Sequence, residues 1–516
     1  MPINTLVQEK ILDFEQMGIP QVFQRDLSLG RIFPPAIGNL VTVIVGARRS
    51  GKTFRLYQQM QQIVDMGYPQ SSLLYFNFED ERLKPYSPQL LTDILDTFYA
   101  MHPESRQQGI FLFFDEIQEV PEWGTFLRRV VDTTKATIYV TGSSSRMLSL
   151  DLATEFRGRS IPREMFPLSF SEFVRYNETL ADSQSQVWGE TRQGVTQKSQ
   201  WKEKVSQTTA GQKTTGQRES RGFSSYETAK LRNLLGMYLQ RGGFMVPLQL
   251  DAPDAMLLLQ EYANRTASMD IVERYGLRNQ KAVSLFLARC LASSARELSI
   301  SKTYNDFRGQ QVPISRQTLS DLLGYFEESY LVSTLDNFGR EISANTRAAK
   351  KVYAVDPGMF TAFSTAASVD LGQRLETAVF NQLRRSSQSA GLVRKGAISR
   401  LLFTADENRG KSKKHEIDFV VGDSLNSLMK GFISNSADGG SSGNSADLQG
   451  SAKRLVQVSV SLDSESTRER ELSALDAAMR KFGLNEGEIV TFDQEEEVAV
   501  SSGTVHVVPA WKWLLG

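Results

Sequence analysis

The chain has 516 residues, too many for one ordinary hydrophobic core, and about 150 residues per domain predicts roughly three domains. Its 59 basic and 59 acidic residues cancel. This balance excludes a polycation held to nucleic acid by bulk attraction, so any nucleic-acid surface must be local. The single cysteine, Cys290, excludes an intramolecular disulfide and a thiolate metal cluster and is typical of a reducing compartment.

The sequence contains no segment that predicts membrane insertion or secretion. No apolar run reaches the roughly 18 residues that span a bilayer, and the opening MPINTLVQEK lacks the basic-then-apolar order of a signal peptide. With only three histidines, a His-rich metal site is not expected either. We therefore expect a cytoplasmic protein without membrane contact.

The first part of the chain, residues 1–180, has the pattern of an α/β domain. Its apolar runs are short, rich in Val, Ile and Phe, and separated by helical stretches. They span residues 40–45, 73–78, 110–114 and 136–141. Buried parallel strands with helices on both faces have this pattern.

An anion-binding loop follows the first of these runs. GARRSGKT has the P-loop (Walker A) spacing and opens a helix at TFRLYQQM. In such a loop the backbone N–H groups and the helix start surround the β-phosphate, Lys52 reaches the β- and γ-oxygens, and Thr53 holds Mg²⁺. The predicted cofactors are ATP and Mg²⁺. The predicted nucleotide-binding residues are Gly46, Ala47, Arg48, Arg49, Ser50, Gly51, Lys52 and Thr53.

Two carboxylates end a later apolar strand, in GIFLFFDEIQEV. Asp115 can hold the water shell of Mg²⁺, and Glu116 can polarise the attacking water. We therefore predict Thr53 and Asp115 as metal ligands and Glu116 as a catalytic residue. Farther along, IYVTGSSS ends another strand in small polar side chains, so Ser143 or Thr141 could bond the γ-phosphate or the water.

Arginines beside these motifs have two interpretations each. Arg157 and Arg159 could reach the γ-phosphate of a neighbouring subunit as arginine fingers, which implies a homo-oligomer, or they could pair with local acids. The side chains of Arg48 and Arg49 are free to meet the acids of FEDER (78–82) or a lid, or they are simply solvated. A basic loop that grips other surfaces when nucleotide is bound would suit a switch.

A polar insertion follows the first domain. Residues 181–225 are almost all Gln, Ser, Thr, Gly and charged, which leaves too little apolar surface to offset the entropy of ordering. We expect this insertion to be disordered. A helical region, expected to form a lid, follows over residues 226–300.

Residues 301–365 have the outline of a winged helix. Apolar residues recur at helical spacing from Leu319 to Phe326 after Ser315, which could cap the helix, and β-prone segments follow. The wing would carry Arg340, Arg347, Lys350 and Lys351.

Residues 366–516 have the pattern of a further α/β domain. The expected order is helix, strands, a flexible low-complexity loop over 434–453, strand, helix, strand and strand. Period-2 alternation predicts the core-facing residues Ile417, Phe419, Val421, Val456, Val458 and Val460. The same alternation places Glu416 and Asp418 together on the other face.

The motifs of this chain, in their order, resemble those of one family. The resemblance to the bacterial and archaeal AAA-domain ATP-binding proteins rests on GARRSGKT, YFNFEDERL, LFFDEIQEVPEW, YVTGSSSRMLS, FRGRSIPREMFPLSFSEF, RGGFMVP, DIVERYGLRN and KVYAVDPGMF. It covers nearly the whole chain outside the polar insertions. It implies an additional-strand AAA-type P-loop sheet, a helical lid, a winged-helix domain and a C-terminal domain similar to the restriction endonucleases and other PD-(D/E)xK nucleases.

The lid departs from its wider signalling-ATPase relatives. In those proteins a Gly-x-Pro lies against the adenine, but GGFMVP has Met245 at the proline position. Gly242 and Gly243 could instead only end a helix.

The resemblance also implies which residues a nuclease site would use. A nuclease of this fold needs an Asp on one strand, Glu-x-Lys on the next, and usually a Glu from the preceding helix. Glu376 and Asp418 are in place, but the Glu and Lys positions hold Gln457 and Ser459, and Glu416 could replace only the missing carboxylate. Loss of the ammonium removes transition-state stabilisation that serine does not supply. We therefore expect a domain that binds without cutting.

Basic residues before these carboxylates could contact DNA phosphates or form a solvated hairpin. They are Arg394, Lys395, Arg400, Arg409, Lys411, Lys413 and Lys414. The leading interpretation is an ATP-binding and ATP-hydrolysing AAA switch that moves its lid, winged helix and nuclease-like domain over DNA. The alternatives are a protein-interaction scaffold without a DNA role and an ATP-gated, Mg²⁺-dependent nuclease.

Overall fold

The described residues form two compact units. The computed structural model describes residues 5–143, 159–187, 223–338, 349–364, 370–389, 397–407, 411–422 and 452–516. The first unit comprises Met1–Pro167, Arg265–Leu277 and Gly324–Leu331, and the second comprises Leu168–Asn264, Arg278–Leu323 and Val332–Gly516. Within the described ranges, none of the helices has the length and apolar character that crossing a bilayer would require.

A five-stranded parallel sheet forms the centre of the first unit. Its strands are β1 (Val41–Gly46), β2 (Leu73–Asn77), β3 (Ile110–Asp115), β4 (Ala136–Gly142) and β5 (Ser160–Met165). The spatial order is β2-β3-β4-β1-β5. The four predicted strands are confirmed, and β4 lies between β1 and β3, as an additional-strand P-loop core requires.

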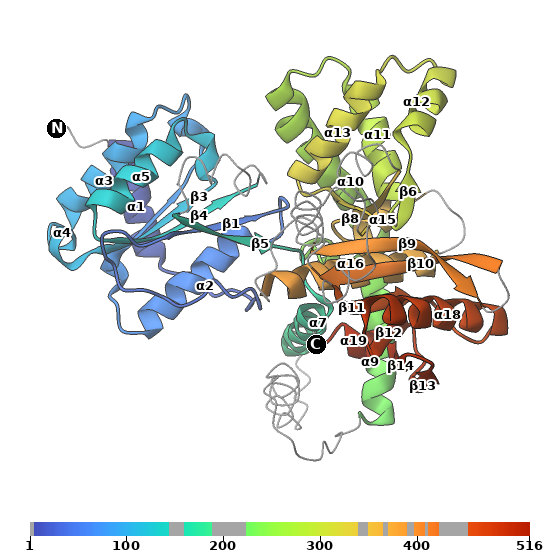
Figure 1. Ribbon diagram of the computed structural model, residues 1–516. Helices are drawn as coiled ribbons and strands as arrows, with labels where there is room; N and C mark the ends of the chain where they lie inside the picture. The colour runs from blue at the N-terminus through green and yellow to red at the C-terminus, as the bar shows by residue number, and fades with distance from the viewer. Residues whose placement is uncertain are drawn as a thin grey trace, which may run out of the picture. The chain divides into compact units, whose positions relative to one another are not determined.

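Helices cover both faces of this sheet. They are α1 (Thr5–Met17), α2 (Lys52–Asp65), α3 (Gln89–Met101), α4 (Ser105–Gln108) and α5 (Trp123–Thr133). Short 3₁₀ turns lie at Gln70–Ser72, Glu81–Leu83 and Ile117–Glu119. In Figure 1, α2 lies on one side of the sheet and α3 and α5 on the other. Apolar residues of α2 pack with those of β2, β3 and β4 in one buried cluster.

Strand β5 was not expected from the sequence. It contains Pro162, Arg163 and Glu164, and only Glu164 and Met165 of its residues are buried. It is an edge strand that pairs with β1 alone. Edge strands tolerate proline and charged side chains because one side of the strand has no ladder to maintain.

The helical region begins earlier than expected. Its helices are α7 (Phe170–Val187), α9 (Ser225–Arg241), α10 (Ala252–Thr266), the π-helix η6 (Ala267–Glu273) and α11 (Gln280–Ala292). Helix α7 extends into the segment predicted to be disordered, which corrects its start, and residues 188–222 lie outside the described residues. Ser224 and Glu227 form a reciprocal capping box that starts α9.

Gly242 ends helix α9, as one interpretation of the glycine pair expects. It has a φ of 74°, and a Cβ there would lie 1.7 Å from Oδ1 of Asp356. The N–H of Gly243 donates to Oδ2 of Asp356 at 2.7 Å. Burial raises the pKa of Asp356 to about 6, against the hydrogen bonds from Gly243 and Gly358. The absence of a Cβ at Gly242 thus allows a buried carboxylate to approach the backbone closely.

A small antiparallel sheet follows in the second unit. Its strands are β6 (Arg296–Leu298), β7 (Val332–Leu335) and β8 (Lys350–Ala354), in the order β6-β8-β7. The neighbouring helices are α12 (Ile300–Gly309), α13 (Arg316–Glu328) and α15 (Pro357–Phe363). Ser315 caps α13 as predicted, since its Oγ accepts from the N–H of Thr318 at 3.0 Å.

The predicted wing needs a correction at its end. Lys350 and Lys351 belong to strand β8, where Lys350 Nζ lies 3.5 Å from Asp336 and the Lys351 side chain is 8% exposed. Lys351 is therefore not a wing cation. Arg340 and Arg347 lie outside the described residues.

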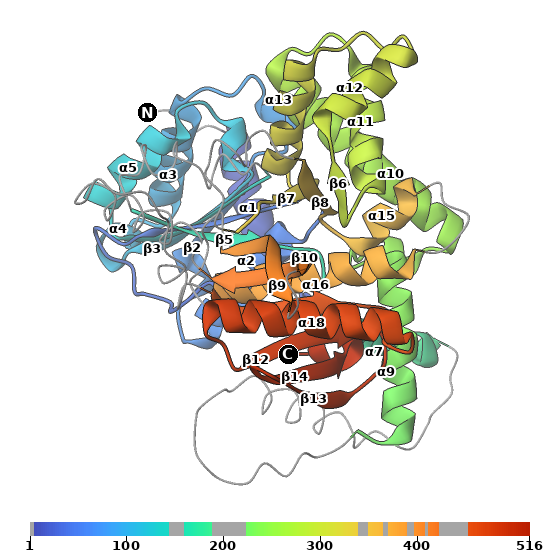
Figure 2. The same ribbon diagram turned by 45° about the vertical axis from the view of Figure 1, so that its right-hand side comes forward.

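A six-stranded mixed sheet completes the second unit. Its elements are α16 (Leu371–Ser389), β9 (Ile398–Glu407), β10 (Lys411–Gly422), β11 (Ala452–Val458), α18 (Glu465–Phe482), β12 (Glu486–Thr491), β13 (Glu496–Val500), β14 (Gly503–Pro509) and α19 (Ala510–Trp513). The strand order is β13-β14-β12-β11-β10-β9. Figure 2 shows α18 lying across this sheet. The sheet has one strand more than expected near the end of the chain, and β11 begins inside the segment predicted to be a flexible loop.

A bulge in β10 changes which side chains share a face. The pairing register with β9 shifts between Ile417 and Val420, and both residues join the core under α18. Phe419 instead stacks on Phe380 of α16, with ring centroids 6.0 Å apart. The prediction that Phe419 shares the core face of Ile417 was wrong because period 2 holds only along a regular ladder. Val460, also predicted to face the core, is 37% exposed beyond the end of β11.

Candidate nucleotide site

Two glycines set the turn of the P-loop. Gly46, the last residue of β1, has a φ of 149°, and a Cβ there would lie 2.1 Å from the carbonyl oxygen of Met165. Gly51 has a φ of 99° and directly precedes α2. Both backbones are in the region that favours glycine. The loop therefore turns tightly from β1 into α2.

The Lys52 ammonium is held between this loop and the end of β3. Its Nζ donates to the carbonyl oxygens of Gly46 and Ala47 at 3.2 and 3.3 Å, and lies 3.4 Å from Oε1 of Glu116. The side chain is buried. A positive charge is thus fixed at the carboxyl edge of the parallel sheet, where open α/β sheets bind ligands.

Asp115 is fully buried and surrounded by hydroxyl groups. Thr141 Oγ1 donates to its Oδ1, and the hydroxyl of Tyr75 donates to Oδ2 at 3.2 Å. Burial raises the pKa of Asp115, against hydrogen bonds from Thr141 and Thr53. Thr53 and Asp115 are thereby brought into contact. This pair fits Mg²⁺, which usually takes one or two protein ligands together with phosphate oxygens and waters.

Glu116 is the other carboxylate of this edge, and its backbone is in the left-handed region with a φ of 55°. Its N–H donates to Thr141 Oγ1 at 2.9 Å, and Nε2 of Gln118 donates to its Oε2 at 2.5 Å. Burial alone would raise the pKa of Glu116, but the Lys52 ammonium and the Gln118 amide hold it below its ordinary value. The group is therefore ionised near neutral pH, as a general base must be.

Three contributors to this site were not predicted. Arg25 is buried, and its Nη1 and Nη2 donate to the carbonyl oxygens of Ser50 and Phe166, both at 2.8 Å. The sequence around Arg25 has no motif, so only the folded chain reveals the contact. Tyr75, in the middle of β2, and Gln118, shortly after β3, bond the two carboxylates, and neither has a clear signal in the sequence.

Arg48 reaches from the P-loop to the helical region within the first unit. Its Nε and Nη2 donate to Oδ2 and Oδ1 of Asp270, both at 2.7 Å, and its Nη1 lies 3.9 Å from Glu79. Asp270 lies in the π-helix η6, a rare element that is frequent at functional sites. The predicted partner segment FEDER thus gives Arg48 only a distant contact, with Glu79. The bidentate partner of Arg48 is Asp270. Arg49 is exposed.

Ser143 and Thr141 differ in their place at the end of β4. Thr141 Oγ1 donates to the Asp115 carboxylate and accepts from the backbone N–H of Glu116, whereas Ser143 is buried with its Oγ 3.5 Å from Nε2 of Gln118. Thr141 is thus part of the carboxylate network, and Ser143 lies beside it.

Arg159 lies at the opposite end of the sheet from the P-loop. The N–H of Val41, at the start of β1, donates to its carbonyl oxygen at 2.9 Å. Its guanidinium pairs with Asp132. The length of β1 separates Arg159 from the loop of the same chain by roughly 17 Å. A role toward a neighbouring subunit stays a prediction, and Arg157 lies outside the described residues.

The second unit brings together the acids that the nuclease resemblance implied. Lys351 Nζ lies 2.6 Å from Oε1 of Glu376, 3.0 Å from Oδ1 of Asp418 and 3.8 Å from Oε1 of Glu416. The hydroxyl of Tyr353 donates to Glu376 at 2.7 Å. An ammonium is therefore present in this cluster, but it comes from β8 and was not predicted there.

The remaining two positions of the implied nuclease pattern are Gln457 and Ser459. Gln457 Oε1 accepts from the N–H of Asp418 at 3.0 Å, and its Nε2 donates to Oε2 of Glu471 at 2.6 Å. Ser459 Oγ donates to the carbonyl oxygen of Ser461 at 2.9 Å. Gln457 thus joins the cluster, while Ser459 bonds its own backbone turn.

The predicted basic surface before these acids is smaller than expected. Arg400 is 2% exposed and pairs with Glu297 at 2.7 Å, so its assignment to a DNA-contacting surface was wrong. Lys414 is exposed. Outside the described residues, or with side chains outside them, lie Arg394, Lys395, Arg409, Lys411 and Lys413.

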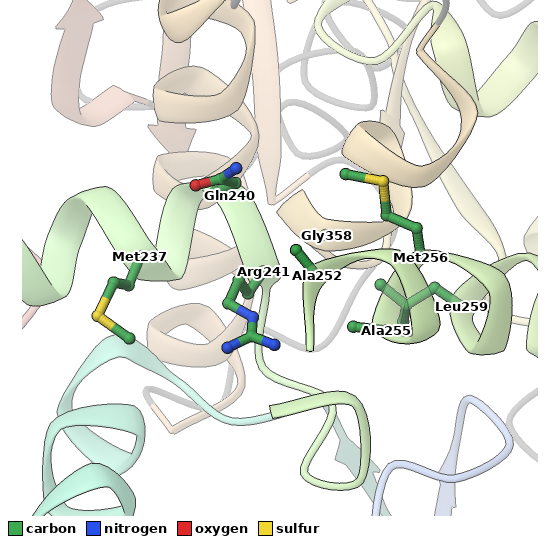
Figure 3. Close-up of a pocket in the computed structure, with 8 residues that line it drawn as sticks. All are labelled: Met237, Gln240, Arg241, Ala252, Ala255, Met256, Leu259 and Gly358. Carbon is green, nitrogen blue, oxygen red and sulfur yellow. The ribbon is translucent and has the colours of Figure 1, made fainter. Parts of the chain in front are cut away.

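An apolar pocket of about 240 Å³ lies in the second unit, apart from these polar groups. Figure 3 shows its lining from α9, α10 and the start of α15. The lining residues are Met237, Gln240, Arg241, Ala252, Ala255, Met256, Leu259 and Gly358. The lining has no carboxylate or nucleophile, so the pocket has no catalytic group of its own.

The parallel sheet with its added strand, the glycine turn, and the lysine facing two strand-end carboxylates fit an AAA-type P-loop fold. Residues 38–174 match the AAA domain family, and residues 232–370 match a domain of unknown function (DUF8612). The first match supports an assignment to the AAA P-loop ATPases, which in general use a nucleotide and a divalent metal ion.

Relatives align along most of the chain. An uncharacterized protein of Methanocaldococcus jannaschii is 29% identical over 530 residues, which cover 99% of this chain and 97% of that protein. One of Haemophilus influenzae is 25% identical over 388 residues, covering 74% and 80%. Among solved structures, a Walker-type ATPase of Pyrococcus abyssi has a TM-score of 0.36 at 13% identity, covering 63% of this chain and 90% of its own. The Orc1 protein of Aeropyrum pernix, solved with DNA, has a TM-score of 0.26 at 12% identity, covering 70% and 92%.

Proposed function

We propose that the protein is an AAA-type ATPase that binds and hydrolyses ATP and acts as a nucleotide-dependent switch. The observation that carries this proposal is the ion pair between Lys52 and Glu116, 3.4 Å apart at the end of β3. A lysine held there can move to a triphosphate, and the carboxylate beside it is placed to receive a proton from water.

Each group of the site has a defined task in this proposal. The backbone N–H groups of the P-loop and the start of α2 surround the phosphates, and Lys52 neutralises charge on the β- and γ-oxygens. Thr53 and Asp115 would hold Mg²⁺, which offsets charge that develops on the transferred phosphoryl group. Glu116 orients and deprotonates the attacking water.

The pair of Arg48 and Asp270 is the proposed link between nucleotide and switch. Its two charge-assisted hydrogen bonds join the P-loop to the π-helix, and both side chains are mostly buried. A triphosphate adds negative charge beside Arg48 and competes for its guanidinium. The strength of the pair between Arg48 and Asp270 of η6 therefore depends on the nucleotide state.

Removal of either partner uncouples the switch while leaving ATP bound. For Arg48→Gln and Asp270→Asn we expect loss of any ATP-dependent change in partner affinity. Because ATP competes with Asp270 for the guanidinium, calorimetry should show tighter ATP binding in Asp270→Asn and weaker ATP binding in Arg48→Gln than in the wild type. The double variant should be no worse than either single one, because both remove the same interaction. The control is Glu79→Gln, whose side chain is 60% exposed and 3.9 Å from Arg48. Single variants that retain the ATP response would contradict this link.

Duplex DNA is the partner we propose, held through a winged helix formed by α11 to β8. The order helix, strand, helix, helix, strand, strand from α11 to β8 supports this assignment. Exposed cations on its helices support a phosphate-contacting surface; they are Lys302, Arg308 and Arg316. Arg316 lies over the ring of Tyr304, 5.0 Å from its centroid, so the two helices α12 and α13 present their charges close together.

Fluorescence anisotropy of a labelled duplex at two salt concentrations, with and without ATP, tests this partner. Three phosphate contacts predict that log K falls with log salt with a slope of about −2.7. Each of Lys302→Ala, Arg308→Ala and Arg316→Ala should reduce the slope by about 1. Lys512→Ala, on α19, removes an exposed cation elsewhere and should leave it unchanged. Absence of binding at low salt in both nucleotide states would exclude DNA.

A protein partner is the second candidate. Helix α13, which a winged helix would place against a DNA groove, carries Asp321, Glu327 and Glu328. Carboxylates facing a duplex would repel its phosphates, so they favour a basic protein surface. In that case the anisotropy would not change, while the ATPase would remain active.

A further inference from the structure

We propose that the ammonium of Lys351 is the built-in cation of the carboxylate site in the second unit. It stands where a nuclease of the implied fold would hold its divalent metal ion, so this site works without metal. The nuclease resemblance serves only to identify the divalent metal ion as the cation that the ammonium replaces. It does not depend on the proposed ATPase switch.

The position of the ammonium leaves no space for a metal ion between the two buried acids. Nζ of Lys351 is within hydrogen-bond distance of both Glu376, at 2.6 Å, and Asp418, at 3.0 Å. A Mg²⁺ ion would need to lie about 2.0–2.1 Å from each of its oxygen ligands. A metal ion bridging the two oxygens that contact Nζ would therefore have to take the place of the ammonium.

Several other polar groups of the cluster already have partners within the protein. The second oxygen of Asp418 accepts from the N–H of Val458 at 3.0 Å. Glu471 accepts from Gln457 and pairs with Arg470 at 2.6 Å. Glu416 is at the rim, with its side chain 46% exposed. Among the residues that the structure describes, no group of three or more acidic, His or Cys side chains is arranged to hold a metal ion.

The charges of the cluster are consistent with one internal cation. Burial alone would lower the pKa of Lys351, but Asp418 and Glu376 raise it above its ordinary value, so the lysine is protonated. Burial and the charge of Asp418 raise the pKa of Glu376 to about 8. A divalent ion at this position would have to expel the ammonium.

The origin of Lys351 gives the site a structural task. It comes from β8 in the three-stranded sheet, whereas Asp418 comes from β10 in the six-stranded sheet and Glu376 from α16. All three elements belong to the second unit. The ammonium therefore fastens the small sheet to the large one through the acids that a nuclease would use for its metal.

Mn²⁺ binding measured by electron paramagnetic resonance tests the inference on nucleotide-free, chelator-treated full-length protein. We expect the wild type and Asp418→Asn to bind the same amount of Mn²⁺, because the wild type has no Mn²⁺ site at Asp418. Lys351→Ala should gain one such site, with at least tenfold tighter Mn²⁺ binding, and Lys351→Ala combined with Asp418→Asn should lose it. The matched control is Lys350→Ala, the adjacent lysine, which should behave as wild type.

Two results would overturn the inference. The first is a wild-type Mn²⁺ site, or Mg²⁺-dependent nicking of supercoiled plasmid, that Asp418→Asn abolishes. The second is a Lys351→Ala protein with the circular dichroism of the wild type that gains no site. If Lys351→Ala does not fold, the melting temperature of the wild type is the test. It should be the same in EDTA and in Mn²⁺. A Mn²⁺-induced rise that Asp418→Asn removes would refute the built-in cation. None of these readouts requires ATP, so they stand apart from a failure of the ATPase.

Discussion

Glu116→Gln lowers steady-state phosphate release by about 10²–10³-fold while leaving ATP bound, which is the loss expected when a general base is removed. Glutamine keeps the volume of the side chain but cannot accept the proton from water. ATP affinity should be unchanged or higher, because one negative charge beside the triphosphate is gone. A phosphate-release assay gives the rate, and calorimetry with ATP and Mg²⁺ gives the affinity.

Glu119→Gln is the matched control for this substitution. Glu119 lies in the same 3₁₀ turn, and burial raises the pKa of its carboxyl, but it makes no ion pair with Lys52 in the described structure. The same change of charge at this position should leave the rate within a small factor of wild type. If both variants hydrolyse ATP at the wild-type rate, Glu116 is not the base, whereas equal losses in both would indicate a general effect of charge.

Lys52→Ala should weaken ATP binding by about 100-fold or more, equivalent to about 2.7 kcal/mol. Lys52 is 5% exposed, so the interaction of its ammonium with phosphate is only weakly screened by solvent. Hydrolysis should fall with it at subsaturating ATP. Calorimetry with ATP and with a slowly hydrolysed analogue measures the affinity.

Arg49→Asn provides a control within the same loop. It removes one positive charge, as Lys52→Ala does, and asparagine tolerates the left-handed backbone of Arg49, which has a φ of 66°. Its backbone N–H remains available to phosphate. We expect a much smaller loss of affinity than for Lys52→Ala. Equal losses would mean that bulk charge, and not the position of Lys52, governs binding.

The sequence predicted the elements whose determinants are local. The P-loop spacing, the apolar strands and the acidic pair of Asp115 and Glu116 are each encoded within a few residues, and the four predicted strands appear within one residue of their expected ends. The strand order follows from these motifs because an additional-strand P-loop core has a known topology. The cap of α13 at Ser315 was predictable for the same reason.

Contacts between distant segments could not be predicted. Lys351 was assigned to a wing because its neighbours in sequence are basic, yet its environment is set by Glu376 and Asp418, which lie on other elements. Asp270 begins the motif DIVERYGLRN, but nothing in that motif indicated Arg48 as its partner, since a single acid in a helix is normally solvated. The bulge that separates Phe419 from Ile417 also depends on pairing between strands, which a period-2 pattern does not describe.

Arg25 has a practical consequence for dissecting the protein. The AAA domain match starts at residue 38, but the guanidinium that supports the carbonyl of Ser50 comes from outside that boundary. A truncated protein starting at residue 38 would contain the complete P-loop motif but would lack Arg25, which supports the loop. Nucleotide binding by an excised domain therefore depends on where the chain is cut, and weak binding by such a fragment would say little about the intact protein.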